Sequence, residues 1–81
     1  EGLAEQLRAI DTTDLAFVVK EIDPNKACKI SMRSKKYDVS KICSAFGGGG
    51  HARAAGCTIK SSVENAVEKI LEEIKRTEYE K

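Results

Sequence analysis

Four consecutive glycines at residues 47–50, followed directly by His51, form the segment whose residue types most clearly point to chemistry. Glycine loses more backbone freedom on folding than any other residue, so a run of four needs a compensating use. One such use is a nest of backbone N–H groups that a phosphate or carboxylate can approach closely. We therefore predict an anion-binding loop here. The alternative interpretation, a flexible linker or hairpin tip, is disfavoured by the apolar residues on both sides of the tract.

Two well-known nucleotide-binding motifs do not fit the glycine tract. The phosphate loop of NTPases ends in Gly-Lys-Ser/Thr, and the dinucleotide fingerprint follows a strand, whereas this tract follows a predicted helix. The chain continues as Ala-Arg-Ala-Ala-Gly over residues 52–56, and these small side chains leave room beside the loop. An anion site here would therefore be of a different kind.

Polar side chains that suit a phosphate lie near the glycine tract in the sequence. His51 is the only histidine, and although a lone histidine is more often structural, an imidazole beside four glycines can donate to a phosphate oxygen or lie against a base. Arg33 and Arg53 offer planar guanidinium groups, and Lys35 and Lys36 add point charges. Arg33 is the better placed arginine, because it ends a predicted strand.

Charge is distributed unevenly along the chain, although the formal net charge is only +1. Residues 26–60 carry eight lysines and arginines against the single acid Asp38, whereas both flanking segments are acidic. A basic middle segment would concentrate an anionic ligand by long-range attraction. A solvated basic face with no ligand is the alternative interpretation of the same pattern.

The three cysteines, Cys28, Cys43 and Cys57, contain no C-x-x-C pair, which argues against a disulfide framework and a zinc ribbon. We expect reduced, buried thiols. Zinc binding by His51, Cys43 and Cys57 is disfavoured because both thiols fall at predicted core positions. The chain also lacks a cluster of Asp and His residues able to hold a metal. We therefore expect this chain to bind no cofactor and to catalyse nothing by itself.

Length and composition describe the domain that must position these residues. With 81 residues, 41% of them hydrophobic and 33% charged, the chain fits one small globular domain. No apolar run reaches the length of a membrane span and no leader pattern opens the chain, so we expect a soluble, cytoplasmic protein with no membrane partner. The chain begins at Glu1 without an initiator methionine, which suggests a fragment of a longer protein.

Local patterns in the first half predict a helix and two strands. Apolar residues at helical spacing favour a short amphipathic helix over residues 2–10. Residues 15–22 are typical of a strand, and the following Asp-Pro-Asn at residues 23–25 predicts a hairpin turn. Residues 27–33 alternate, which places Cys28, Ile30 and Met32 on the core face and Arg33 on the opposite face.

The second half predicts two helices and a strand. Asp38 is expected to cap a helix over residues 39–46, which Gly47 ends. A brief strand follows at residues 57–60. A final helix carries an apolar stripe over residues 63–74 and begins with a predicted capping box of Ser61 and Glu64.

This order of elements predicts an α+β (mixed α/β) domain with a small mixed β-sheet flanked by helices and a GGGGH loop after a short helix. Three strands are few, so we expect an upstream strand to complete the sheet. Two copies sharing edge strands, as a homodimer, are a further option that nothing in the sequence requires.

The motifs Arg33-Ser34-Lys35, Val39-Ser40-Lys41-Ile42 and Phe46-GGGG-His51, with the later Ala-Ala-Gly, resemble the C-terminal, DHH-associated domain of the DHH (Asp-His-His) phosphoesterases. The similarity covers about residues 3–75 and is most specific over residues 33–56. Arg-Ser at a strand end followed by Gly-Gly-Gly-His is most similar to the oligoribonuclease (nano-RNase) and phosphoadenosine-phosphate phosphatase branch. RecJ-like exonucleases, cyclic dinucleotide phosphodiesterases and the terminal domain of alanyl-tRNA synthetases are more distantly similar.

The resemblance implies a two-domain hydrolase whose absent N-terminal catalytic domain binds manganese through Asp and His residues, while this domain holds the substrate. It implies that Arg33 and Ser34 contact a substrate phosphate, that Gly48, Gly49 and Gly50 supply amides, and that His51 contacts a phosphate or base. Arg53 occupies a more variable position. The implied partners are the catalytic domain and a short single-stranded oligonucleotide or a nucleotide phosphate.

Three functional hypotheses follow. The first is the substrate-binding domain of a manganese-dependent exonuclease, oligoribonuclease or nucleotide bisphosphate phosphatase. The second is a non-catalytic nucleic-acid-binding module, such as a tRNA-contacting domain of a synthetase-like protein. The third is a structural or dimerisation domain. Arginine, glycine and histidine recognise phosphate, which RNA, DNA, bisphosphates and cyclic dinucleotides share, so the sequence leaves the substrate open.

Overall fold

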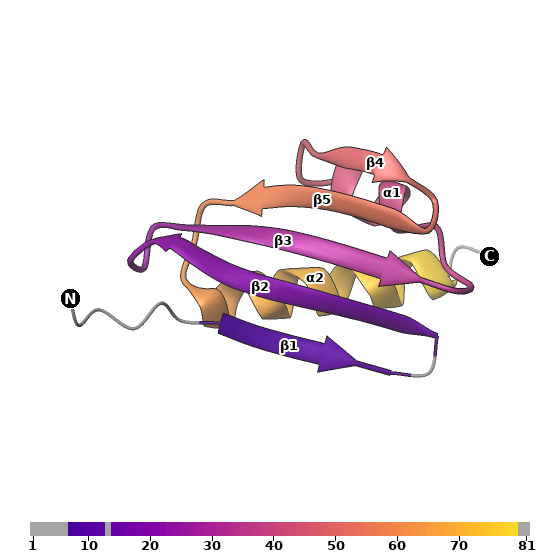
Figure 1. The fold of residues 1–81 in the computed structure, drawn as a ribbon, viewed down its shortest axis with the longest axis horizontal. Coiled ribbons are helices and arrows are strands. Elements are labelled where there is room, and N and C mark those ends of the chain that lie inside the picture. The colour runs from indigo at the N-terminus through magenta and orange to yellow at the C-terminus, as the bar shows by residue number, and fades with distance from the viewer. Residues whose placement is uncertain (1–6, 13, 80–81) are drawn as a thin grey trace.

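The computed structural model describes residues 7–12 and 14–79 as one antiparallel sheet with two helices (Figure 1). The elements along the chain are β1 (Leu7–Asp11), β2 (Leu15–Asp23), β3 (Ala27–Ser34), α1 (Val39–Ser44), β4 (Gly49–His51), β5 (Ala54–Ile59) and α2 (Val63–Tyr79). The strand order is β1-β2-β3-β5-β4, and every neighbouring pair is antiparallel. The predicted α+β class is confirmed, although the sheet is antiparallel and not mixed.

Both helices cover the same face of the sheet. In Figure 1, α2 lies behind β2 and β3, and α1 lies behind β4 and β5. Alternate residues of the central strands are buried on this face, as in β2, where Leu15, Phe17 and Val19 point into the core. Because strand side chains alternate between faces, the residues between these project from the opposite side of the sheet, which carries no helix in the described part. We call this side the open face.

The β2–β3 hairpin confirms its prediction. Cys28, Ile30 and Met32 are buried, as the alternating pattern indicates. The turn is closed by the Lys26 amide, which donates to the Asp23 carbonyl at 2.8 Å, and Asn25 takes the left-handed conformation with φ of 58°. Asparagine tolerates that conformation better than most residues.

The predicted helix over residues 2–10 is wrong for the part that the structure describes. Leu7–Asp11 forms the edge strand β1, which pairs with β2 so that Ile10 lies opposite Phe17; residues 2–6 lie outside the described residues. Pairing with the long β2 strand satisfies the backbone of this segment, and this tertiary contact overrides the helical spacing of its few apolar residues. β1 is therefore a strand where a helix was predicted, and the further strand expected upstream stays a prediction.

Helix α1 begins at its predicted cap but ends earlier than predicted, at Ser44. The Asp38 carboxylate accepts hydrogen bonds from the Ser40 and Lys41 amides at 3.0 and 3.4 Å, and these bonds, with the Ser40 hydroxyl making the largest contribution, lower the pKa of Asp38. At the other end, Gly47 adopts a φ of 82°, which favours glycine, and so ends the helix as expected.

The glycine tract continues into a strand that the sequence analysis missed. Residues 49–51 form β4 and pair with β5, which starts at Ala54 instead of Cys57. Glycine and alanine have low strand propensity, so neither segment carries a local signal. The tract is therefore a helix end joined to an edge strand.

The fold requires the absence of a side chain at only some positions of the glycine tract. A Cβ atom at Gly48 would overlap the Gly56 carbonyl oxygen and lie 2.6 Å from the Cys57 Cβ, and one at Gly50, whose φ is 146°, would lie 2.7 Å from the Ala54 carbonyl oxygen. A Cβ at Gly49 would meet no atom within 4 Å. Folding therefore explains Gly48 and Gly50 but leaves Gly49 unexplained.

Helix α2 confirms the predicted apolar stripe, with Val63, Ala66 and Ile70 buried. Its cap differs from the prediction by one position. The Ser62 hydroxyl accepts from the Asn65 amide at 3.3 Å, whereas the Ser61 hydroxyl donates to the Ser62 carbonyl at 2.9 Å. In the described part of the chain, neither helix is long and apolar enough to span a membrane.

The three cysteines are free and buried, as predicted. Burial is the main cause that raises the pKa of the Cys57 thiol to about 12, and the neighbouring Cys43 contributes further. Burial likewise raises the pKa of Cys28 and of Cys43. All three thiols are therefore protonated near neutral pH and act as small apolar core groups.

We predict that Gly48→Ala destabilises the domain by roughly 1–3 kcal/mol, because its methyl group overlaps backbone atoms that cannot move independently of the sheet. Gly49→Ala is the matched control, and its stability should be unchanged or slightly higher because the methyl group enters open space. Urea denaturation of the two variants measures the difference. Equal stabilities would contradict the close packing of Gly48 against β5.

We also predict that the folded protein reacts slowly with Ellman's reagent at pH 8, because thiolates are the reactive form and burial both blocks and protonates the thiols. The same protein in guanidinium chloride should release three equivalents of colour rapidly. Rapid reaction of all three thiols under native conditions would show that the core is not packed as described.

Candidate functional site

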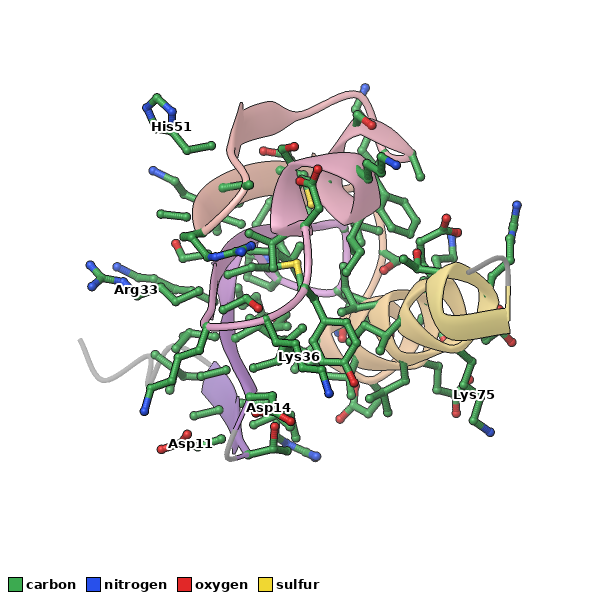
Figure 2. The ribbon with its side chains drawn as sticks, turned by 90° about the vertical axis from the view of Figure 1, so that its right-hand side faces the viewer. Asp11, Asp14, Arg33, Lys36, His51 and Lys75 are labelled. Carbon is green, nitrogen blue, oxygen red and sulfur yellow. The ribbon has the colours of Figure 1, made fainter. Side chains whose placement is uncertain are left out.

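The open face brings the predicted arginine and histidine into one row. Following the cross-strand pairs from β1 to β4, the row runs through Asp11, Ala16, Arg33, Ala54 and His51. Paired residues in a sheet project to the same side. Figure 2 accordingly shows Arg33 and His51 extending away from the sheet on the side opposite α2, which carries Lys75.

The side chains of Arg33 and His51 are exposed and unengaged. Neither makes a hydrogen bond or ion pair through its side chain with any other residue that the structure describes. They stand two strands apart, which places their backbones roughly 10 Å from each other. The alanine between them, Ala54, leaves the space over the row free. Two donors separated in this way can hold two different groups of one ligand.

Small residues line the next row of the open face. Val18 on β2 is followed by Ser31, Gly56 and Gly49 on β3, β5 and β4. Gly49, which folding does not require, thus lies beside Gly56 where a side chain would rise over the face. The part of the open face on β3, β5 and β4 therefore has few large side chains. It is bordered by basic groups, including Lys29 of β3.

A pocket lies at the end of the Arg33 row that is nearer β1. Its lining includes Arg33, Lys35 and Arg53, but also Asp11 and Asp14. The two carboxylates would repel a phosphate at this end of the row. Beyond Arg33, the row continues over Ala54 to His51 and carries no acidic side chain.

Ser34 is placed beside Arg33, but its hydroxyl is used by the backbone. It donates to the Asp14 carbonyl at 3.1 Å and accepts from the amides of Lys36 and Tyr37 at 3.0 and 2.6 Å. These three bonds fill the capacity of a hydroxyl group. In this conformation Ser34 shapes the turn after β3, and its predicted contact with phosphate stays a prediction.

Arg53 lies in the turn between β4 and β5. Its guanidinium donates to the Tyr37 carbonyl at 3.1 Å, and its own carbonyl accepts from the Ser34 amide at 3.1 Å. The neighbouring Ala52 carbonyl accepts from the Val39 amide at 2.9 Å. Arg53 therefore ties the β4–β5 turn to the end of β3, and it also lines the pocket beside Arg33.

The glycine amides do not form the predicted nest of successive free donors. The Gly47 and Gly48 amides donate to the Ser44 and Cys43 carbonyls, each at 3.0 Å, and so satisfy the end of α1. Gly49 and Gly50 lie in β4, an edge strand paired with β5, so their amides alternate between facing β5 and pointing away from it. What the glycines provide instead is a thin strand that carries His51 and approaches β5 closely. Ligand contacts of Gly48, Gly49 and Gly50 remain predictions.

Cys43 and Cys57 do not converge with His51, because both thiols are buried on the helix side of the sheet and His51 projects from the open face. Among residues 7–12 and 14–79, no three His, Cys, Asp or Glu side chains are grouped as a metal site would require. On the part of the open face formed by β3, β5 and β4, the available groups are cations, hydroxyls and small residues, and these suit an anionic ligand.

Sequence reasoning placed Arg33 correctly but could not relate it to His51. The strand alternation over residues 27–33 was the signal for Arg33. The contribution of Gly56 and Thr58 to the open face was missed because it depends on the pairing of β3 with β5, which brings together residues far apart in the chain.

The chain matches a model of a known domain family. The family model of the DHHA1 domain matches residues 1–79. DHHA1 domains are the accessory domains of DHH phosphoesterases, where they usually accompany an N-terminal DHH catalytic domain and bind nucleotide or nucleic-acid substrate. The chain belongs to the DHHA1 domain family.

Proposed function

We propose that this domain holds the phosphate groups of a short oligonucleotide or nucleotide and positions them against the metal centre of a DHH catalytic domain in the same protein. The parent activity that fits best is that of an exonuclease or oligoribonuclease, or of a nucleotide bisphosphate phosphatase. The proposal places the protein in the cytoplasm, where such substrates occur.

The observation that carries this proposal is the shared row of Arg33 and His51 on the open face. A guanidinium group that is not bonded to any of the described residues can give a phosphate two parallel hydrogen bonds. An imidazole can donate to a second phosphate or lie against a base. Because the two groups are roughly 10 Å apart, a ligand must be longer than one phosphate to reach both. Short nucleotides meet this requirement.

The described residues of this chain do not fit a manganese site, so the proposal assigns the metal to the catalytic domain. Manganese bound there would supply the activated water and stabilise the leaving group. The contribution of this chain is to fix the position of the phosphodiester relative to that centre, which makes the reaction effectively intramolecular.

We predict that a 5′-phosphorylated dinucleotide shifts the NMR signals of Arg33, His51 and their sheet neighbours, and that added salt weakens the binding because phosphate contacts dominate it. Arg33→Ala and His51→Ala should each lower the affinity by about tenfold. Lys75→Ala is the control, since it removes a positive charge from α2 on the other side of the sheet (Figure 2). Loss of affinity equal to that control, or shifts confined to the helices, would contradict the proposed site.

A second prediction tests whether Ser34 contacts the ligand directly or only stabilises the turn after β3. Ser34→Ala should lower the stability by about 1–2 kcal/mol, because the Lys36 and Tyr37 amides lose their acceptor. Thermal unfolding measures this loss, and the dinucleotide titration of the same variant measures binding. If stability is unchanged while affinity falls as far as in Arg33→Ala, then Ser34 contacts the ligand directly and its hydrogen bonds to the turn are not important.

A further inference from the structure

A second pocket opens on β3 and β5 beside the short β4 strand. Lys29, Ser31, Phe46, Gly56 and Thr58 are among the residues that line it, together with the first glycines of the tract. Its central residues, Ser31 and Gly56, form the row next to Arg33 and Ala54. Two residues along a strand correspond to about 7 Å, so the pocket lies one row away from the proposed phosphate position.

The walls of this pocket are fixed by the fold. Phe46 is half-buried and packs against the hydrophobic core, which holds its ring in place. Its amide donates to the Cys43 carbonyl at 3.0 Å, and the two following glycine amides are bonded to the end of α1 as described above. The side of the pocket formed by Phe46 and the glycines is therefore in place before any ligand arrives, which reduces the entropic cost of binding.

The floor and rim differ in chemistry. Gly56 has no side chain, so a flat ligand can approach the sheet backbone. Around it stand the Ser31 and Thr58 hydroxyls and the Lys29 ammonium group, all on exposed residues. Their side chains make no hydrogen bond or ion pair with the part of the chain that the structure describes. Three unused polar groups thus surround a surface of apolar and backbone atoms.

This combination is complementary to a heterocyclic ring with nitrogen and oxygen atoms at its edge. An aromatic wall and a backbone floor suit the faces of such a ring, and hydroxyl and ammonium groups suit its edge. A sugar phosphate without a base would leave both unused. The distance of one row from Arg33 matches the separation of a phosphate from the base of its own nucleotide.

We infer that this pocket binds the nucleobase of the nucleotide whose phosphate is held by Arg33. The inference rests on the proposed phosphate site and adds to it a position for the base, in the pocket lined by Ser31, Thr58 and Phe46. The domain then reads two parts of one nucleotide, the phosphate in one row of the open face and the base in the next rows.

The test compares two probes, a 5′-phosphorylated dinucleotide and ribose 5-phosphate, by NMR titration of this chain. Ser31→Leu fills the pocket from an exposed position and leaves the core unchanged. This variant should lower the affinity for the dinucleotide by about tenfold, while the affinity for ribose 5-phosphate should change by no more than about twofold. Thr58→Val, which replaces the hydroxyl with a methyl group, should lower the affinity for the dinucleotide less than Ser31→Leu does. Asn65→Leu is the matched control on α2, and both probes should bind it normally.

The Phe46 ring provides a readout that does not depend on affinity. Its proton signals should shift upfield with the dinucleotide and stay in place with ribose 5-phosphate, since only a base carries a ring current. If Arg33→Ala weakens both probes but Ser31→Leu affects them equally and Phe46 does not respond, the base pocket is disproved and the phosphate site stands. If Arg33→Ala weakens neither probe, the proposed function itself fails.

Discussion

The close packing of Gly48 against Gly56 and Cys57 is the constraint on which the open face depends. It lets the chain leave α1 and run at once alongside β5, so that β4 forms and carries His51 into the row of Arg33. A side chain at this point would push β4 away from the sheet. The geometry of the site thus depends on the absence of one methyl group on the helix side of the sheet.

The two faces of the sheet differ in burial and in chemistry. Apolar residues from β2, β3 and β5 seal one face against α1 and α2, and this burial supplies the stability of the domain. The other face is free to carry charges, hydroxyl groups and glycines that contribute little to folding. Exposed cations with no ion pair cost the fold little and are available for a ligand. A domain of this size can therefore combine a stable core with a surface that is free for a ligand.

Elements with strong local patterns were predictable from the sequence, and elements made by long-range pairing were not. The alternation in β3, the turn after β2 and the stripe of α2 each follow from side chains within one segment. β1 and β4 exist because a neighbouring strand satisfies their backbone, and a segment of glycines or scattered apolar residues does not reveal this. For the same reason the exposure of Arg33 was predictable, whereas its alignment with His51 required the order of five strands.

The turn at residues 52–53 has a consequence for motion. Its two carbonyls accept hydrogen bonds from the amides of Val39 and Ser34, so it is attached both to the start of α1 and to the end of β3. The segment that carries His51, β4 and the turn after it, cannot move away from the domain unless both of these hydrogen bonds break. We therefore expect hydrogen exchange in the turn at residues 52–53 to be coupled to the opening of α1. A ligand held by His51 would in turn slow the fraying of α1. Binding on the open face would then make the helix on the opposite side of the sheet more rigid.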